Sequence, residues 1–199
     1  MIKLIAGLGN PGAQYEATRH NAGFWFIDTL AHQAGITLSQ ETRFHGSVGR
    51  MHVDGQTVWL IAPQTFMNRS GQAISALAKF HRISPAEILV VHDELDLLPG
   101  SARLKLGGGS GGHNGLKDTI AHLGENGFWR LRLGIGHPRN LLSKPEQEPQ
   151  DVATYVLKPP RAEEEKRILD AIMQAQSAVK ILINGDSAAA MQTLHTLCK

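Results

Sequence analysis

Apolar residues follow two different spacings along this chain of 199 residues. Short, mostly apolar runs, typical of buried strands, occur at residues 2–8, 58–62 and 88–91, and residues 130–135 are also expected to form a strand. Between these runs, apolar side chains recur every three or four residues, as they do on one face of a helix. The first such stripe contains Phe24, Ile27, Leu30, Ala31 and Ala34 and ends at Gly35. The alternation of strands and helices predicts an α/β fold.

Turn and cap signals place the remaining elements. Asp54 and Gly55 separate the runs 44–53 and 56–62 and predict a two-residue hairpin. Thr18, Ser70 and Asn114 are each expected to cap the helix that follows. Further elements are expected as a helical turn at residues 84–87, a short strand at 103–106, a long helix after residues 159–160 and a last helix after Gly185.

The predicted elements imply one domain over residues 1–199. We expect a three-layer α/β sandwich with a mixed, mainly parallel twisted sheet flanked by helices. Residues 63–69 are expected to form a loop between a strand and a helix. The polar, proline-containing stretch 141–150 is expected to be a mobile loop.

Polar side chains follow three of the predicted strands. Asn10 comes after the first run, Asn68 after the run 58–62, and Asp93 after the run 88–91. In open α/β sheets, ligands bind outside the carboxyl ends of the strands. If these strands are parallel neighbours, the three side chains share one crevice.

His20 lies at the expected start of the helix after the first strand. The positive end of a helix dipole disfavours the imidazolium ion and so favours the neutral ring that a general base requires. Asp93 could accept the other ring N–H and fix the tautomer. A base that activates water directly needs no serine or cysteine nucleophile. A capping or surface histidine is the alternative interpretation of this position.

Two glycine-rich stretches suggest other chemistry. Residues 7–12 (GLGNPG) match the G-x-G-x-x-G pattern of dinucleotide-binding folds. However, the polar stretch 14–19 delays the helix, and Asp28 lies inside that helix rather than after a second strand. The run 107–112 lacks the Gly-Lys-Ser/Thr ending of a phosphate-binding loop. It is more typical of a lid, or of a backbone that approaches a substrate closely.

Composition limits the compartment and the metal chemistry. The single cysteine, Cys198, excludes an intrachain disulfide and a cysteine-rich metal site and fits a reducing compartment. The ten histidines include no His-Glu-x-x-His pair, and scattered surface histidines are the expected interpretation. No apolar run approaches the length of a membrane span.

The charge is concentrated in one segment of the chain. The formal net charge is only +2, but residues 101–144 contain seven lysines and arginines and two acidic residues. Such a basic segment is usually a solvated face. It is also compatible with a phosphate-rich partner.

Six ordered motifs together resemble the bacterial-type peptidyl-tRNA hydrolase family, with Tyr15 between the first two. They are residues 7–12 (GLGNPG), 18–23 (TRHNAG), 65–71 (TFMNRSG), 92–96 (HDELD), 105–115 (KLGGGSGGHNG) and 134–138 (GIGHP). The resemblance covers most of the chain. It implies hydrolysis of the ester between a peptidyl group and the 3′ end of tRNA by a cytoplasmic monomer. It also implies that no cofactor, metal, membrane or protein partner takes part.

The resemblance also assigns site residues. It implies that His20 is the catalytic base, that Asp93 is its supporting acid, and that Asn10 distinguishes blocked from free aminoacyl groups. The substrate-binding positions it implies are Tyr15, Phe66, Met67, Asn68, His113 and Asn114. Lys105 and Arg132 match positions that hold a tRNA phosphate, with Arg130 as the alternative to Arg132.

Two further hypotheses remain open from the sequence. A dinucleotide-dependent reductase would use the glycine motif at residues 7–12. A catalytically silent RNA-binding relative would share the fold, as a plant organelle splicing factor resembling this family does.

Overall fold

The computed structural model describes residues 1–141 and 151–198 and contains one seven-stranded sheet in the order β2-β3-β4-β1-β5-β7-β6. The four central strands, β4, β1, β5 and β7, are parallel, whereas β2, β3 and β6 run antiparallel to their neighbours. The bounds of the strands are β1 Leu4–Gly7, β2 Ser39–Glu41, β3 Gly46–Val53, β4 Gln56–Pro63, β5 Ile88–Glu94, β6 Ala102–Leu106 and β7 Trp129–Gly134.

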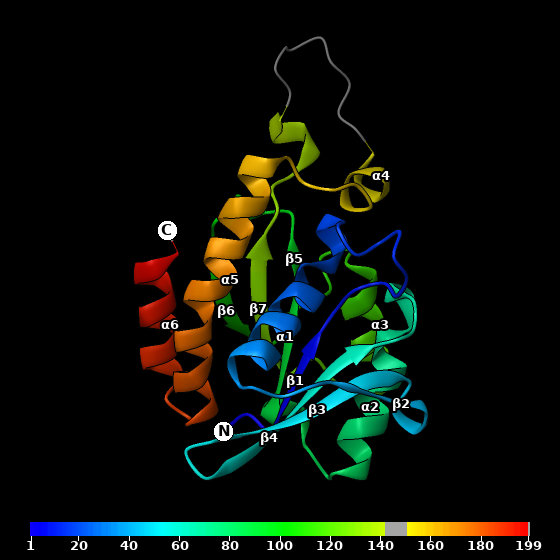
Figure 1. The fold of residues 1–199 in the computed structure, drawn as a ribbon, viewed down its shortest axis with the longest axis vertical. Coiled ribbons are helices and arrows are strands. Elements are labelled where there is room, and N and C mark those ends of the chain that lie inside the picture. The colour runs from blue at the N-terminus through cyan, green and yellow to red at the C-terminus, as the bar shows by residue number, and fades with distance from the viewer. Residues whose placement is uncertain (142–150, 199) are drawn as a thin grey trace.

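Helices cover both faces of the sheet, which confirms the expected three-layer α/β sandwich (Figure 1). One layer holds α1, α5 and α6, and the other holds α2 and α3. The bounds of the helices are α1 Ala22–Gln33, α2 Ser70–Phe80, α3 Asn114–Leu123, α4 Val152–Val156, α5 Ala162–Ile183 and α6 Ser187–Leu197. No helix of the described residues is both long and apolar enough to cross a membrane.

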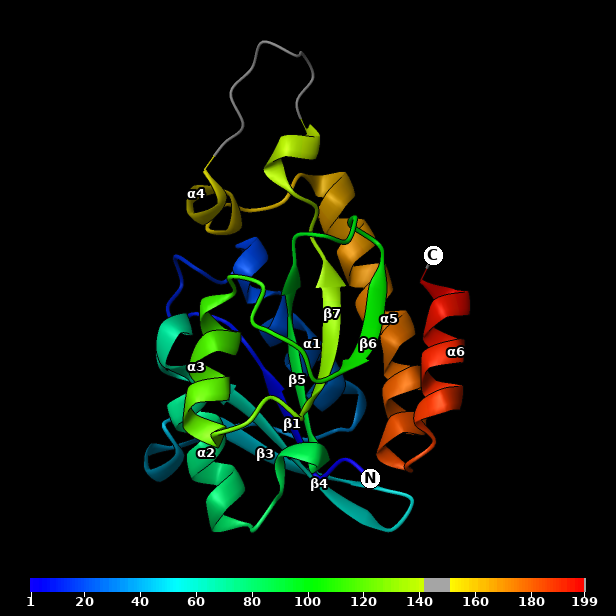
Figure 2. The same cartoon turned by 180° about the vertical axis from the view of Figure 1, so that it is seen from behind.

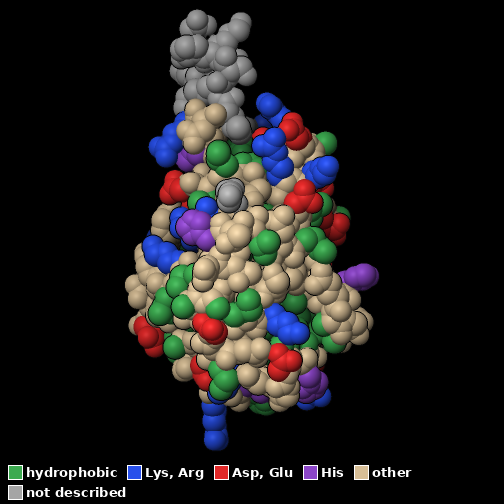
Figure 3. Space-filling model, turned by 90° about the vertical axis from the view of Figure 1, so that its left-hand side faces the viewer, with side chains coloured by type: hydrophobic (Ala, Val, Ile, Leu, Met, Phe, Trp, Pro, Cys, Tyr) green, Lys and Arg blue, Asp and Glu red, His purple; other side chains and the backbone are tan. Residues whose placement is uncertain are grey.

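The parallel strands are buried because a hydrophobic cluster packs on each face. Ile5 faces the cluster that contains Phe26 of α1 and Ile172 of α5, and Leu4 faces the one that contains Leu77 of α2. All five side chains are fully buried. Burial on both faces explains why β1 and β5 are continuous apolar runs rather than alternating ones. The outer side of α5 and α6 is mixed, with hydrophobic and charged side chains interspersed (Figure 3).

The two faces of the sheet are not covered equally. Seen from behind, α2 and α3 lie over one half of the sheet, whereas the segment between β6 and α3 is what crosses in front of β5 and β7 (Figure 2). This segment contains the glycine run 107–112. The half of the sheet formed by β7 and β6 therefore presents side chains that no helix covers on this side.

Three expected helix caps are wrong, because none of the three residues directly precedes the helix it was expected to cap. Thr18 Oγ1 donates to the Tyr15 carbonyl, and α1 begins only at Ala22, after a short 3-10 turn at Arg19–Asn21. Ser70 is the first residue of α2 itself, and its Oγ donates to the Met67 carbonyl. Asn114 is the first residue of α3, and the cap before it is His113.

The hairpin and the helical turn are confirmed. Asp54 and Gly55 have positive φ values of 48° and 83°, as a tight turn of this hand requires, and they join β3 to β4. Pro85–Glu87 forms a 3-10 turn with a capping box at Ser84. Most of the mobile loop expected at residues 141–150 lies outside the described residues.

Glycines of the 7–12 motif allow β1 and α1 to approach closely. A Cβ on Gly7 would lie 2.2 Å from the Gly23 carbonyl oxygen, and one on Gly23 would lie 2.4 Å from the Leu8 nitrogen. No helix begins within the motif, since α1 starts ten residues after Gly12. The motif therefore lacks the helix N-terminus that binds pyrophosphate in dinucleotide folds, and the alternative of a dinucleotide site is not supported.

The close approach predicts that Gly23→Ala destabilises the fold. The added methyl group would meet backbone atoms of Leu8 and Val91, which cannot move independently of the sheet. We expect a loss of about 1–3 kcal/mol in the free energy of unfolding, measured by urea denaturation. Gly127→Ala is the matched control, because its Cβ would meet only the end of the Glu125 side chain. Equal stability of the two variants would contradict the packing argument.

Candidate active site

A pocket of about 730 Å³ opens at the carboxyl ends of the central strands. Asn10, Asn68 and Asp93 all line it, and they follow or end β1, β4 and β5 respectively. Leu4 of β1 pairs in parallel register with Trp59 on one side and Ile88 on the other. The expectation that three parallel neighbours bring these side chains into one crevice is confirmed.

The Asp93 carboxylate connects two histidines in this pocket. Asp93 is 4% exposed and lies within β5, whose strand extends beyond the predicted run to Glu94. Its Oδ1 lies 3.0 Å from His20 Nδ1 and 2.9 Å from His113 Nε2. The two imidazole rings are 5.0 Å apart, centroid to centroid. One buried carboxylate thus fixes the positions of two rings that come from different elements.

The tautomer of His113 follows from its role as the cap of α3. Its Nδ1 accepts the backbone N–H groups of Gly115 and Leu116, at 3.2 and 3.3 Å. An Nδ1 that accepts carries no proton, so the neutral ring is protonated on Nε2 and donates from there to Asp93. His113 therefore joins the start of α3 to the carboxyl end of β5.

His20 stands in the 3-10 turn before α1 rather than in the first turn of α1 itself. The preceding residue, Arg19, is buried and anchors this turn. Its guanidinium donates to Glu164 at 2.7 Å and to the carbonyls of Tyr155, Lys158 and Pro159. The turn that bears His20 is thereby tied to the chain between α4 and α5.

Asp93 and burial act in opposite directions on the pKa of His20. Burial lowers the pKa of the His20 imidazole, but the charge of Asp93 and its hydrogen bond together raise it, and the net pKa lies above the ordinary 6.5. This direction is opposite to the one expected from a helix dipole, because the carboxylate favours the protonated ring. Burial raises the pKa of Asp93, but His20 and His113 outweigh it and hold the pKa well below 3.8.

Asn10 is held in one orientation by the Asn21 side chain and by the Met67 backbone N–H. Its backbone N–H donates to Asn21 Oδ1, and its backbone carbonyl accepts from Asn21 Nδ2. Its own Oδ1 accepts the Met67 N–H at 2.7 Å. Because the amide oxygen is occupied in this way, Nδ2 is the side-chain atom left to donate to a ligand.

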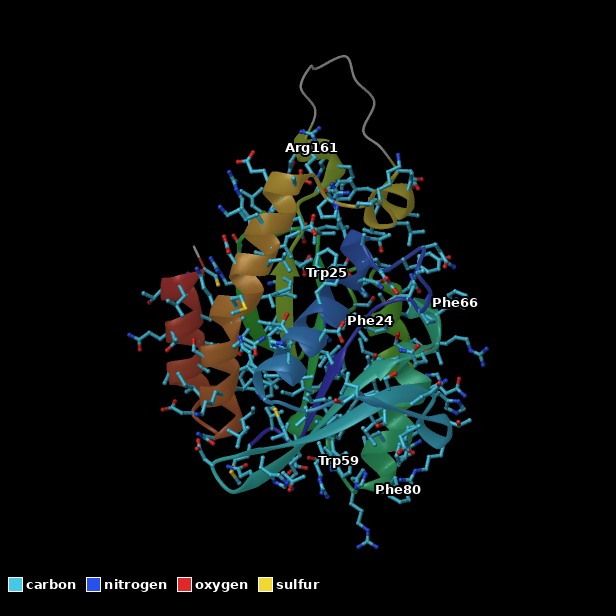
Figure 4. All side chains as sticks on the ribbon, in the orientation of Figure 1. Phe24, Trp25, Trp59, Phe66, Phe80 and Arg161 are labelled. Carbon is cyan, nitrogen blue, oxygen red and sulfur yellow. The ribbon has the colours of Figure 1, made fainter. Side chains whose placement is uncertain are left out.

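The remaining predicted contacts differ in exposure. Met67 is buried, whereas Phe66 is 57% exposed and projects from the side of the molecule (Figure 4). Asn68 and Asn114 line the pocket and are exposed. Tyr15 is not among the lining residues but meets the Phe66 ring edge-on, with centroids 6.3 Å apart. Phe66 therefore lines the pocket at its exposed edge, and Tyr15 lies behind it.

The two histidines and Asp93 are close enough to coordinate a metal ion, because one ligand atom from each lies within 4.8 Å of the others. A cation would have to displace the proton from His20 Nδ1 and from His113 Nε2. His113 would then need a proton on Nδ1, where two backbone N–H groups already point. The residues therefore fit a hydrogen-bonded arrangement better than a metal centre.

Comparison with known proteins gives a consistent result. The family model described as peptidyl-tRNA hydrolase matches residues 4–199. A peptidyl-tRNA hydrolase from Cupriavidus pinatubonensis is 57% identical over 199 residues, all of both chains. One from Cupriavidus metallidurans is 57% identical over 98% of this chain and 99% of its own. The crystal structure of peptidyl-tRNA hydrolase from Acinetobacter baumannii has a TM-score of 0.89 and 48% identity, covering 99% of this chain and 96% of its own.

The chain belongs to the peptidyl-tRNA hydrolase family. It is therefore an enzyme of that family, as the six motifs indicated.

The pocket has a further wall, and the sequence did not indicate the part of it that α4 forms. Val152, Val156 and Leu157 line it from α4 and the residue after α4, and His137 and Arg139 line it from the chain that follows β7. These residues lie more than forty positions after Asp93. His137 belongs to the motif at residues 134–138, but α4 has only five residues, which is too short for a helical pattern of apolar side chains to mark it.

The basic positions lie on the uncovered half of the sheet rather than in the pocket. Lys105 of β6 is exposed, and Arg132 of β7 is half-buried and pairs with Glu94 at 2.8 Å between Nε and Oε2. Arg130, the alternative to Arg132, is 3% exposed and donates to the carbonyls of Gly108 and Gly109. The geometry favours Arg132 over Arg130 as a side chain that a ligand can reach.

The coupling of His20 to Asp93 predicts the effect of Asp93→Asn on the imidazole pKa. Without the carboxylate, burial remains as the main influence, so the pKa of His20 should fall from above 6.5 to below it. The measurement is an NMR titration of the ring protons, with the His20 resonance assigned by its loss in His20→Gln. A pKa that does not move in Asp93→Asn would show that the two side chains are not coupled.

Proposed function

We propose that this enzyme hydrolyses the ester between a peptidyl or other N-blocked aminoacyl group and the 3′ end of tRNA, with His20 as the base that activates water. The proposal rests on one observation above all, the hydrogen bond of His20 Nδ1 to the buried Asp93 carboxylate. This bond leaves Nε2 as the ring nitrogen that can take a proton. Asp93 thereby holds the tautomer that a base requires.

The reaction needs no covalent intermediate. His20 Nε2 takes a proton from water as the water oxygen forms a bond to the ester carbonyl carbon. The tetrahedral intermediate then collapses, the bond to the 3′ oxygen of tRNA breaks, and His20 returns its proton to that oxygen. The imidazolium formed in between is stabilised by the charge of Asp93, which already favours the protonated ring.

Asparagine amides suit the charge that develops on the ester oxygen. Asn10 presents Nδ2 because its Oδ1 is held, and Asn68 and Asn114 line the same pocket. One donor to such an oxyanion contributes about 2.7–4 kcal/mol of transition-state stabilisation in a comparable acyl-transfer site. We assign Asn10 the further role of distinguishing a blocked from a free amino group, and Tyr15, Phe66, Met67 and His113 the role of lining the substrate site.

The uncovered half of the sheet suits a nucleic acid backbone. Lys105 and Arg132 lie on neighbouring antiparallel strands and would supply sequence-independent phosphate contacts. Because such contacts release counterions, binding should weaken as salt increases. We further propose that residues 1–199 act as one unit, as a cytoplasmic monomer without a cofactor.

The mechanism predicts that His20→Ala abolishes cleavage and leaves tRNA binding nearly unchanged. Loss of the base should lower the single-turnover rate on N-blocked aminoacyl-tRNA by at least about 100-fold. His195→Ala, at an exposed position on α6, is the matched control and should retain the wild-type rate. Normal turnover by His20→Ala would exclude this mechanism, and absence of cleavage by the wild type would support the catalytically silent relative.

The assignment of Lys105 as a phosphate contact predicts that Lys105→Met weakens tRNA binding and makes that binding less dependent on salt. Removing one phosphate contact should raise KM by about tenfold and should reduce the slope of log KM against log salt by about one. The turnover number should stay near that of the wild type, because Lys105 does not line the pocket. Lys180→Met on α5 serves as control. An unchanged salt slope in Lys105→Met would remove Lys105 from the tRNA contact.

A further inference from the structure

The glycine-rich segment at residues 107–112 adopts a backbone that few side chains permit. Gly107, Gly108, Gly111 and Gly112 have positive φ values of 69°, 105°, 57° and 82°. The segment leaves the end of β6, crosses β7 and β5, and leads directly into His113 and Asn114 (Figure 2). It has no apolar side chain that could pack on the sheet, so its position depends on hydrogen bonds.

Arg130 supplies two of those hydrogen bonds from beneath the segment. Its Nη1 donates to the Gly109 carbonyl and its Nη2 to the Gly108 carbonyl. The guanidinium also lies over the Phe128 ring, 4.8 Å from its centroid, and Phe128 is fully buried. A planar guanidinium suits two adjacent acceptors, whereas an ammonium group lacks this fork geometry.

We propose that Arg130 is a positioning residue, which ties the segment 107–112 to β7 and thereby sets where His113 and Asn114 stand in the pocket. The inference rests on the proposed function of that pocket. It gives Arg130 a role other than phosphate binding. Arg130 is 3% exposed, and both of its terminal nitrogens are occupied by backbone carbonyls.

Neighbouring charges strengthen this distinction. A Cβ placed on Gly108 would lie 3.0 Å from Lys105 Nζ and 3.8 Å from Arg130 Nη1, so both cations border the same glycine. Lys105 is exposed and can reach a phosphate from outside the segment, whereas Arg130 holds the segment from the sheet side. Lys105 and Arg130 therefore lie on opposite sides of the segment 107–112.

Arg130→Lys and Arg130→Met together test the proposal. Hydrogen exchange of the segment 107–112 is measured by mass spectrometry, and kcat and KM are measured on N-blocked aminoacyl-tRNA at two salt concentrations. We expect both variants to exchange this segment at least tenfold faster than the wild type. We also expect kcat to fall by about 10- to 100-fold, because small displacements of site groups are costly. The salt slope of KM should not change in Arg130→Lys. Arg167→Met, an exposed position on α5, is the control.

The charge-conserving variant separates positioning from phosphate binding. If Arg130 bound phosphate, Arg130→Lys would largely retain the wild-type activity. Arg130→Met would then change KM and the salt slope of KM, while hydrogen exchange of the segment 107–112 would stay at the wild-type rate. Either that pattern, or faster exchange with an unchanged kcat, would overturn the proposal. If Arg130→Met fails to fold, Arg130→Lys alone decides. The exchange measurement needs no turnover, so it stands even if the wild type proves unable to cleave the ester.

Discussion

The buried carboxylate of Asp93 is the interaction on which the site depends. It accepts from His20, which stands before α1, and from His113, which begins α3. A carboxylate that is 4% exposed is costly unless it is paired and hydrogen-bonded, and the two imidazoles meet that demand. The same pairing lowers the pKa of Asp93 and raises that of His20. The packing of the pocket and the acid–base chemistry proposed for it therefore share one cause.

The remainder of the fold brings these elements to one place. Three parallel strands end at the pocket, and the close approach of Gly7 to Gly23 sets the distance between β1 and α1. Arg19 anchors the turn of His20 to the chain after α4. On the opposite side, Arg130 holds the glycine-rich segment that leads to His113. The connections made by Arg19 and Arg130 each use a buried polar side chain to join segments that are separated in sequence.

The sequence predicted the strands, the hairpin and the shared crevice because periodicity and turn residues report local structure. It did not predict which side chains cap the helices, because local sequence sets helix boundaries only to within a few residues: α1 begins four residues after Thr18, and α2 and α3 already include Ser70 and Asn114. The direction of the pKa shift of His20 was also not predicted, because the helix position was visible and the short distance to Asp93 was not. The wall from α4 and the anchoring role of Arg130 arise only from contacts between distant segments.

The tautomer of His20 tests the central claim most directly. At a pH above its pKa, long-range proton–nitrogen NMR of the ring distinguishes the two neutral forms. The account predicts a proton on Nδ1, bound to Asp93, and an unprotonated Nε2 that is free to act as a base. A neutral His20 protonated on Nε2 would contradict the account, since that ring could neither donate to Asp93 through Nδ1 nor take a proton from water at Nε2.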